Sequence, residues 1–168
     1  MRRPSKVTGK MKSVALGFGT ITLTLGLVVA LTPTLGAFGL KTPFIEVNLG
    51  CLEPGGTFSV VERRRIPLSV TNVGDEPVQL VIEVVRPSLK ELRQGYEAIP
   101  DINWIRFQQD RFVVGPGKNA ITNVFITVPD DERYVGHKYQ AWLWSHTPPG
   151  GGITAGLRSL LLFSICEE

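Results

Sequence analysis

The stretch IPLSVTNVGDEPVQLVIEVV, residues 66–85, alternates apolar and polar side chains and is interrupted once by turn residues. A period of two is typical of a half-buried β-strand, because successive side chains of a strand point to opposite faces. We expect these apolar side chains to face the core: Ile66, Leu68, Val70, Val78, Leu80, Ile82 and Val84. Between them, Gly74 tolerates a positive φ and Pro77 ends the turn. The stretch therefore predicts two consecutive strands that share one buried face.

The same succession of short strands and turns continues along the chain. We expect further strands at 44–48, 57–62, 104–108, 111–114, 120–128, 138–145 and 157–166. Residues 87–101 break the alternation and predict an irregular crossover with one helical turn near residues 88–92. Short strands at intervals of roughly 8–12 residues are typical of two packed antiparallel sheets. The expected fold is therefore all-β, a two-sheet antiparallel sandwich formed by residues 40–168.

The first 39 residues differ in character from the rest of the chain. Five Lys and Arg residues occur within the first 12 positions, and residues 13–40 carry no charged side chain. A basic start followed by an apolar run and small residues is typical of a secretory signal peptide, here with cleavage expected at 35–37 or 37–39. The run is also long enough to span a bilayer of about 30 Å, so an uncleaved signal anchor, a transmembrane helix, is the alternative. In both cases the positive-inside rule keeps the N-terminus in the cytoplasm and exports residues 40–168.

The net charge of +3 reflects this leader and not the expected domain. From Leu40 onward there are 13 Lys and Arg residues against 15 Asp and Glu residues, so the body carries a charge near −2. Nucleic-acid binding needs a basic folded surface, and the basic residues here are concentrated before the domain begins. The composition therefore argues against a nucleic-acid partner.

The chain has two cysteines, Cys51 and Cys166, one near each end of the expected domain. Export places them in an oxidising compartment, where a disulfide can form and persist. Such a bridge would close nearly the whole body into one loop and stabilise it by roughly 4–5 kcal/mol on a chain-entropy model. The alternative is two unrelated free thiols.

Several segments resemble bacterial and archaeal surface domains of the immunoglobulin-like or fibronectin-III-like type. The resemblance is carried by PGG at 54–56, IPLSVTNVGDEPVQL at 66–80, VVGPGKNAITNVFITVPDD at 113–131 and VGHKYQAWLW at 135–144. It covers residues 51–166 and implies the immunoglobulin-like sandwich. It implies no particular activity, because such domains serve adhesion, envelope architecture and enzyme accessory roles alike.

The strand KYQAWLWSH, residues 138–146, carries large apolar groups on both faces. The resemblance implies that Tyr139, Ala141 and Leu143 point into the core. The opposite row, a candidate binding strip for a sugar or a protein partner, is Gln140, Trp142, Trp144 and His146. Two alternatives remain open for this row: the crossover at 87–103 covers it, or it is itself the core row. Trp104 is a further aromatic candidate that could equally be core filling.

Other polar clusters give little support for chemistry. His137 and His146 are roughly 30 Å apart along an extended strand and cannot share a metal unless the strand bends. The acidic run at 130–132 lacks the spaced oxygen ligands of a calcium site and fits a solvated turn better. Ser145 and His146 leave a strand on opposite faces, which rules out a direct nucleophile–base pair between them. The basic run at 62–65 is expected to be a charged edge strand, with contact to an anionic polymer or lipid as the alternative.

These observations predict a non-catalytic, exported module of the cell envelope that requires no metal or other cofactor. Its expected partner is an envelope protein or a polysaccharide, bound through the outer row of the strand at 138–146. The membrane itself is a further partner if the leader is not cleaved. The alternative is a structural subunit of a surface fibre or envelope assembly, joined through sheet edges by strand addition.

Overall fold

The computed structural model describes residues 38–149 and 155–166, which belong to a compact unit spanning Thr34–Glu168. The expected signal peptide or anchor, residues 1–39, lies outside the described residues apart from its last two positions. Among the residues that the structure describes, no helix has both the length and the apolar character to cross a membrane.

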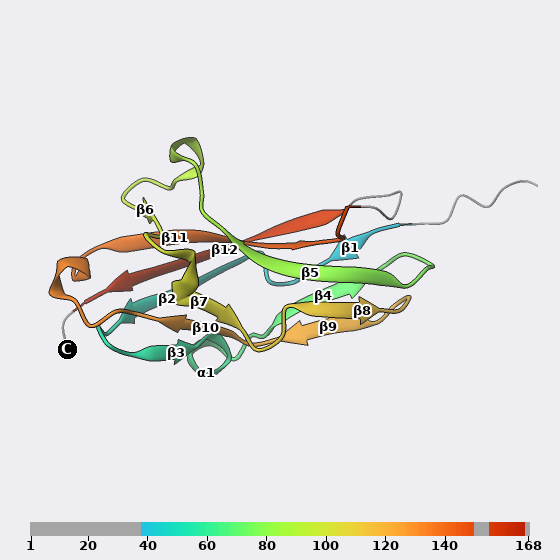
Figure 1. Cartoon of the computed structure of the whole chain (residues 1–168), viewed down its shortest axis with the longest axis horizontal. Coiled ribbons are helices and arrows are strands. Elements are labelled where there is room, and N and C mark those ends of the chain that lie inside the picture. The colour runs from blue at the N-terminus through green and yellow to red at the C-terminus, as the bar shows by residue number, and fades with distance from the viewer. Residues whose placement is uncertain (1–37, 150–154, 167–168) are drawn as a thin grey trace, which may run out of the picture. The chain divides into compact units, whose positions relative to one another are not determined.

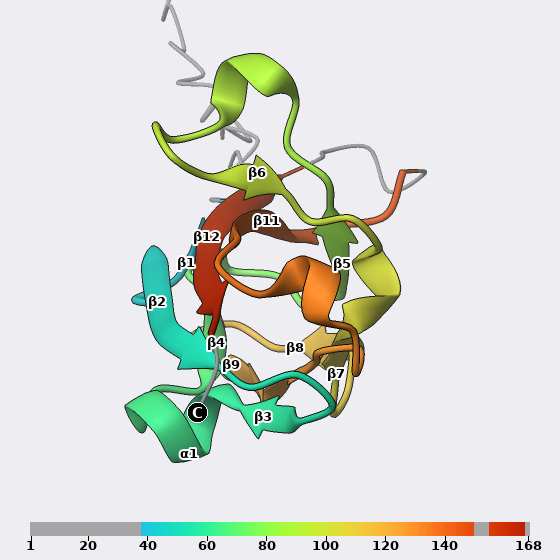
Figure 2. The same cartoon turned by 90° about the vertical axis from the view of Figure 1, so that its left-hand side faces the viewer.

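The described residues form two layers of β-structure (Figure 1 and Figure 2). One layer is a single sheet, which we call the large sheet, with the order β2 (Glu46–Leu52), β12 (Gly156–Ile165), β11 (Lys138–His146), β5 (Val78–Val85) and β8 (Arg111–Val114). The other layer contains two short sheets: β1 (Leu40–Lys41), β4 (Leu68–Asn72) and β9 (Asn119–Thr122); then β3 (Thr57–Ser59), β10 (Val124–Thr127) and β7 (Ile105–Phe107). The all-β sandwich expected from the sequence is confirmed.

One continuous core fills the space between the layers. The alternation at residues 66–85 places its side chains in that core as expected, since these five are buried: Leu68, Val70, Val78, Leu80 and Ile82. Val84 is partly buried and packs against the same cluster. Ile66 was expected in the inward row but is 45% exposed, because it precedes β4 and lies outside the pleat that sets the alternation.

The expectation of a purely antiparallel sandwich is wrong at two pairings. β2 runs parallel to β12, and the two-residue strand β6 (Glu97–Ala98) runs parallel to β11. The chain changes layers between β1, which pairs with β4, and β2. Pro43 lies at this change, and its missing N–H cannot continue a ladder. The N-terminal strand thereby comes to lie along the C-terminal strand.

Residues 57–62 were expected to form a strand, and the basic run at 62–65 a charged edge strand; both expectations are wrong beyond Ser59. Helix α1 (Val60–Arg64) begins there, because the Ser59 hydroxyl accepts a hydrogen bond from the Glu62 N–H at 3.1 Å and caps the first turn. The helix ends at Arg65, which adopts a left-handed conformation with φ 58°. The basic run at 62–65 therefore belongs to a short surface helix.

The strand expected at 120–128 is divided in two at Asn123. The Asn123 side chain donates to the Ser59 hydroxyl at 2.8 Å and accepts from the Val61 N–H at 3.3 Å. Strand β9 before it pairs with β4, and β10 after it pairs with β3. Asn123 thus connects the start of helix α1 to the break between β9 and β10, and these hydrogen bonds stabilise both features.

A cluster of three aromatic side chains, Trp104, Tyr134 and Tyr139, packs together at one end of the core. Trp104 packs edge-on against Tyr134 at 4.9 Å and against Tyr139 at 5.6 Å between ring centroids. Trp104 is only 7% exposed, which favours core filling over binding for this residue. Burial, with smaller contributions from Glu97 and Tyr134, raises the pKa of Tyr139 to about 12. The phenol at the centre of this group therefore stays neutral at physiological pH.

Cys51 on β2 and Cys166, directly after β12, form a disulfide with their Cα atoms 5.7 Å apart. The bridge lies where β2 resumes its parallel pairing after a register shift opposite Leu162 and Ser164. The Cys166 N–H also donates to the Leu52 carbonyl at 3.2 Å. The disulfide therefore fixes the first long strand to the last one.

Replacing Cys166 with Ser should lower the free energy of unfolding by about 2–5 kcal/mol, because the open chain regains loop entropy in its unfolded state. Chemical denaturation of the non-reduced protein would measure this loss. The Cys51→Ser variant and the double variant should give the same loss, since each removes the same bridge. An intact mass with no two-dalton deficit relative to the reduced chain would contradict the bridge itself.

Candidate functional site

The two faces of β11 have different surroundings. Tyr139, Ala141 and Leu143 point into the core and are at most 2% exposed, as the resemblance to surface domains implied. The candidate binding row lies on the outer face of the large sheet: Gln140, Trp142, Trp144 and His146. Their burial is not uniform, because an additional segment covers part of that face.

The covering segment is the crossover at residues 86–100, which we call the strap. Gln140 fixes it: its side-chain carbonyl accepts from the Arg93 N–H at 2.9 Å, and its amide donates to the Glu91 carbonyl at 2.8 Å. The main chain of Gln140 also accepts from the Ile99 N–H at 3.0 Å. Gln140 is completely buried, so it is an attachment point for the strap and is not open to a partner.

Ion pairs extend the attachment across the sheet. Arg93 binds both carboxylate oxygens of Glu46 on β2, the shorter pair of atoms being 2.5 Å apart. Arg158 on β12 contacts Glu91 at 2.8 Å. Hydrogen bonds from the hydroxyl and the N–H of Ser88, together with Arg158, hold the pKa of Glu91 below its usual range. Glu91 is thus ionised at neutral pH and available to both contacts.

The strap divides the outer face into a covered half and an open half. Leu160 and Leu162 pair with Trp142 and Gln140 and share their face, yet they are only 6% and 1% exposed. Trp142 is partly buried, and its indole N–H is buried without an acceptor among the described residues. The open half comprises Gln79, Val81, Glu83, Arg111, Val113, Trp144, His146 and Pro148.

Trp144 and His146 form a stacked pair in the open half. Their ring centroids are 4.0 Å apart with an interplanar angle of 19°. Gly156 lies beneath them, and a Cβ at that position would come within 2.6 Å of the Trp144 indole nitrogen. The His146 ring nitrogens lie 3.2 Å from Glu83 Oε2 and 3.1 Å from the Thr147 carbonyl. Trp144 is partly buried and His146 is 7% exposed, so the pair is held in a fixed orientation.

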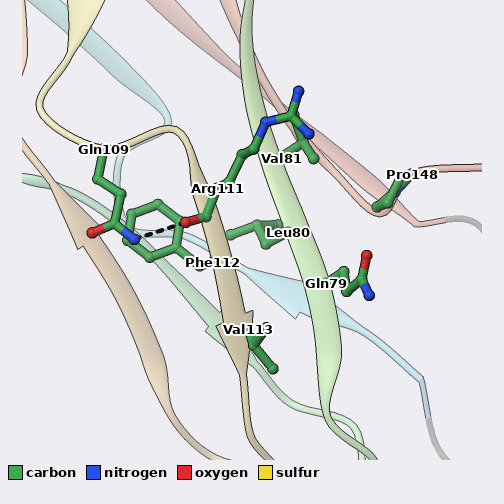
Figure 3. Close-up of a pocket in the computed structure, with 8 residues that line it drawn as sticks. All are labelled: Gln79, Leu80, Val81, Gln109, Arg111, Phe112, Val113 and Pro148. Carbon is green, nitrogen blue, oxygen red and sulfur yellow. Dashed lines mark hydrogen bonds between the residues drawn. The ribbon is translucent and has the colours of Figure 1, made fainter.

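A groove adjoins this pair over β5 and β8 (Figure 3). Its volume is about 510 Å³, within the range of small-ligand sites. Cross-strand pairs set its walls: Val81 lies opposite Arg111, and Gln79 lies opposite Val113. Val81 also pairs with His146 on the other side, which connects the groove to the aromatic pair. No local sequence pattern indicated this groove, since its walls come from strands that only the register brings together.

The remaining polar candidates of the sequence are the acidic run at 130–132 and the two histidines. Among residues 38–149 and 155–166, no three His, Cys, Asp or Glu side chains come together to hold a metal ion. Asp131 pairs with Arg133 at 2.7 Å and caps the short helix η3 (Glu132–Tyr134), which accounts for the acidic run there. His137 contacts Glu97 at 2.8 Å. Where the structure describes them, these groups are engaged in local contacts.

Comparisons with known proteins identify the fold of the chain but neither its family nor its function. No protein-family model matches the chain, and no curated protein matches it in sequence. The ASH/PapD-like domain 7 of human CEP192 is similar in structure, with a TM-score of 0.54, 14% identity, and coverage of 77% of this chain and 86% of that one. A Bacteroides ovatus protein to which carbohydrate binding has been ascribed has a TM-score of 0.57 and 13% identity, over 77% of this chain and 37% of that one. The chain thus has a PapD-like, immunoglobulin-like sandwich fold.

The Gln140→Met variant tests whether the strap depends on this buried amide. Methionine fills a similar volume but leaves the Arg93 N–H and the Glu91 carbonyl without partners, so we expect the free energy of unfolding to fall by about 2–4 kcal/mol. Hydrogen exchange at the Arg93 amide should also become faster. The control is Gln79→Met in the open half, which should change stability by less than about 0.5 kcal/mol. Equal effects of the two substitutions would contradict the assigned role of Gln140.

Proposed function

We propose that the chain is an exported, non-catalytic module of the cell envelope that binds a protein partner on the open half of the large sheet. The observation that carries this proposal is the division of the outer face by the strap. One half is sealed by hydrogen bonds and ion pairs, while the other presents a partly buried tryptophan beside a groove of about 510 Å³. Tryptophan in a partly desolvated setting is typical of residues that dominate protein interfaces.

A protein partner suits this face better than a polysaccharide. Sugar rings stack on the flat face of an exposed aromatic side chain, but His146 already covers one face of Trp144. Phe112, the aromatic residue that lines the groove, packs against the core. Stacking by His146 leaves at most one ring face of Trp144 for a ligand, beside the aliphatic side chains of Val81, Val113 and Pro148, and this mixed surface fits the side chains of a polypeptide.

Export is supported by the leader and by the cysteines. The basic and apolar start of the chain is typical of a secretory signal or anchor. The disulfide between Cys51 and Cys166 is typical of proteins outside the reducing cytosol. A non-catalytic role agrees with the contacts of both histidines, which go to carboxylates and a carbonyl and not to a nucleophile.

Replacing Trp144 with Ala should weaken partner binding at least tenfold, because it removes the largest side chain of the open half. The full chain would first be screened against phage-displayed peptides and against a panel of envelope polysaccharides, and dissociation constants would then be measured for the ligands recovered. The matched control is Ile121→Ala, which removes an apolar side chain that is 57% exposed on β9 in the other layer.

The control variant should bind as the unaltered protein does, and thermal unfolding of both variants would verify that they fold. A ligand whose affinity is unchanged by Trp144→Ala would place the binding face elsewhere. Polysaccharides as the only ligands recovered would overturn the choice of a protein partner.

A second candidate, a subunit joined through sheet edges, is favoured by strand β8. It ends the large sheet, and Val113 on it is 79% exposed. However, the Gln109 side chain donates to the Arg111 carbonyl at 2.7 Å and so occupies part of that edge. Edge-to-edge assembly predicts polymers that grow with concentration in analytical ultracentrifugation. A monomer at every concentration would exclude this candidate.

A further inference from the structure

The groove over β5 and β8 combines an aliphatic wall with one exposed arginine. Val81, Val113 and Pro148 supply the aliphatic surface, and Val113 projects with 79% of its surface exposed (Figure 3). Arg111 lies on the rim of the groove and is exposed. Val81 and Arg111 are cross-strand neighbours, so an aliphatic side chain and a positive charge lie next to each other in the groove.

Arg111 differs from Arg93 and Arg158, the two arginines whose ion pairs fix the strap. Arg93 and Arg158 are each held by a carboxylate of the domain itself. Among the ion pairs that join described residues, none includes Arg111. A guanidinium presents its N–H donors in a planar fork that matches a carboxylate with two parallel hydrogen bonds. The Arg111 guanidinium, exposed and outside the ion pairs of the described residues, therefore has the chemistry to bind an acidic group of a partner.

The backbone holds this fork in a defined position. The Arg111 carbonyl accepts the hydrogen bond from Gln109, and the residue pairs with Val81 across the ladder. The Ile82 N–H donates to the Asp110 carbonyl at 2.8 Å, which secures the start of β8. Because the strand is fixed at this end, little backbone ordering would accompany binding.

We propose that this groove recognises an acidic, aliphatic segment of a protein partner. The carboxylate of an Asp or Glu side chain meets Arg111, and an adjacent aliphatic side chain packs against Val81, Val113 and Pro148. This rests on the proposed function, since the groove is continuous with Trp144 and His146, and it specifies the partner by charge complementarity. A volume of about 510 Å³ is large enough to receive the side chains of a short segment.

The test uses phage-displayed heptapeptides selected on the full chain. The recovered sequences should be enriched in Asp or Glu next to Val, Leu or Ile. The tightest of these peptides, synthesised with a fluorophore, should bind Arg111→Gln at least tenfold more weakly than the unaltered protein, by fluorescence polarisation. Its affinity should also fall as salt is raised, because the contact at the rim is exposed to solvent. Arg106→Gln is the matched control, since Arg106 is an exposed arginine on β7 in the other layer.

A charge exchange separates recognition from general attraction. Arg111→Glu should lose the acidic peptide and recover affinity for the same peptide with its acid replaced by Lys. Recovered peptides without acidic residues, or equal losses in Arg111→Gln and Arg106→Gln, would overturn the inference. So would tighter binding of a uronic-acid oligosaccharide than of any peptide.

The same experiment distinguishes this inference from the proposed function. If Trp144→Ala abolishes peptide binding while Arg111→Gln leaves it unchanged, the open half is the binding face but acidic recognition at the groove is wrong. If neither substitution affects binding, both proposals fail.

Discussion

The outer face of the large sheet depends on one buried amide, the side chain of Gln140. It satisfies a donor on Arg93 and an acceptor on Glu91, and both groups belong to a strap that has little regular structure of its own. An irregular segment can lie flat on a sheet only if its main-chain polar groups find partners there. This contact therefore decides which half of the face is sealed and which half remains open to a partner.

The pleated geometry of β-strands explains why the buried side chains at residues 66–85 could be predicted from the sequence. Alternation at residues 66–85 identified most of the inward row, because a strand that faces a core on one side must repeat with period two. The errors arose where a distant side chain changed the local structure. Ser59 is hydrogen-bonded to Asn123, 64 residues away, and this pair accompanies both the helix after Ser59 and the break between β9 and β10. No window of neighbouring residues contains that information.

The candidate site was predictable only in part for a similar reason. The resemblance implied which side chains of β11 point outward, and covering of that row by the crossover was one of two alternatives left open. The sequence did not show that Gln140 would be sealed while Trp144 stayed partly open. That difference comes from the strap, whose Glu91 contacts Arg158 across 67 residues. The groove was missed entirely, since Val81 and Arg111 are ordinary strand residues until the β5–β8 register places them side by side.

The packing around Trp144 has a consequence for binding. Gly156 leaves room beneath the indole, and His146 stacks against it while contacting Glu83 and the Thr147 carbonyl. Free rotation of a side chain must be given up when a partner immobilises it, at a cost of about 0.5–1.5 kcal/mol for each flexible side chain. Trp144 has already lost much of that freedom in the isolated domain. If the open half binds a protein as proposed, this restriction lowers the ordering cost of binding and favours selective recognition by a small surface.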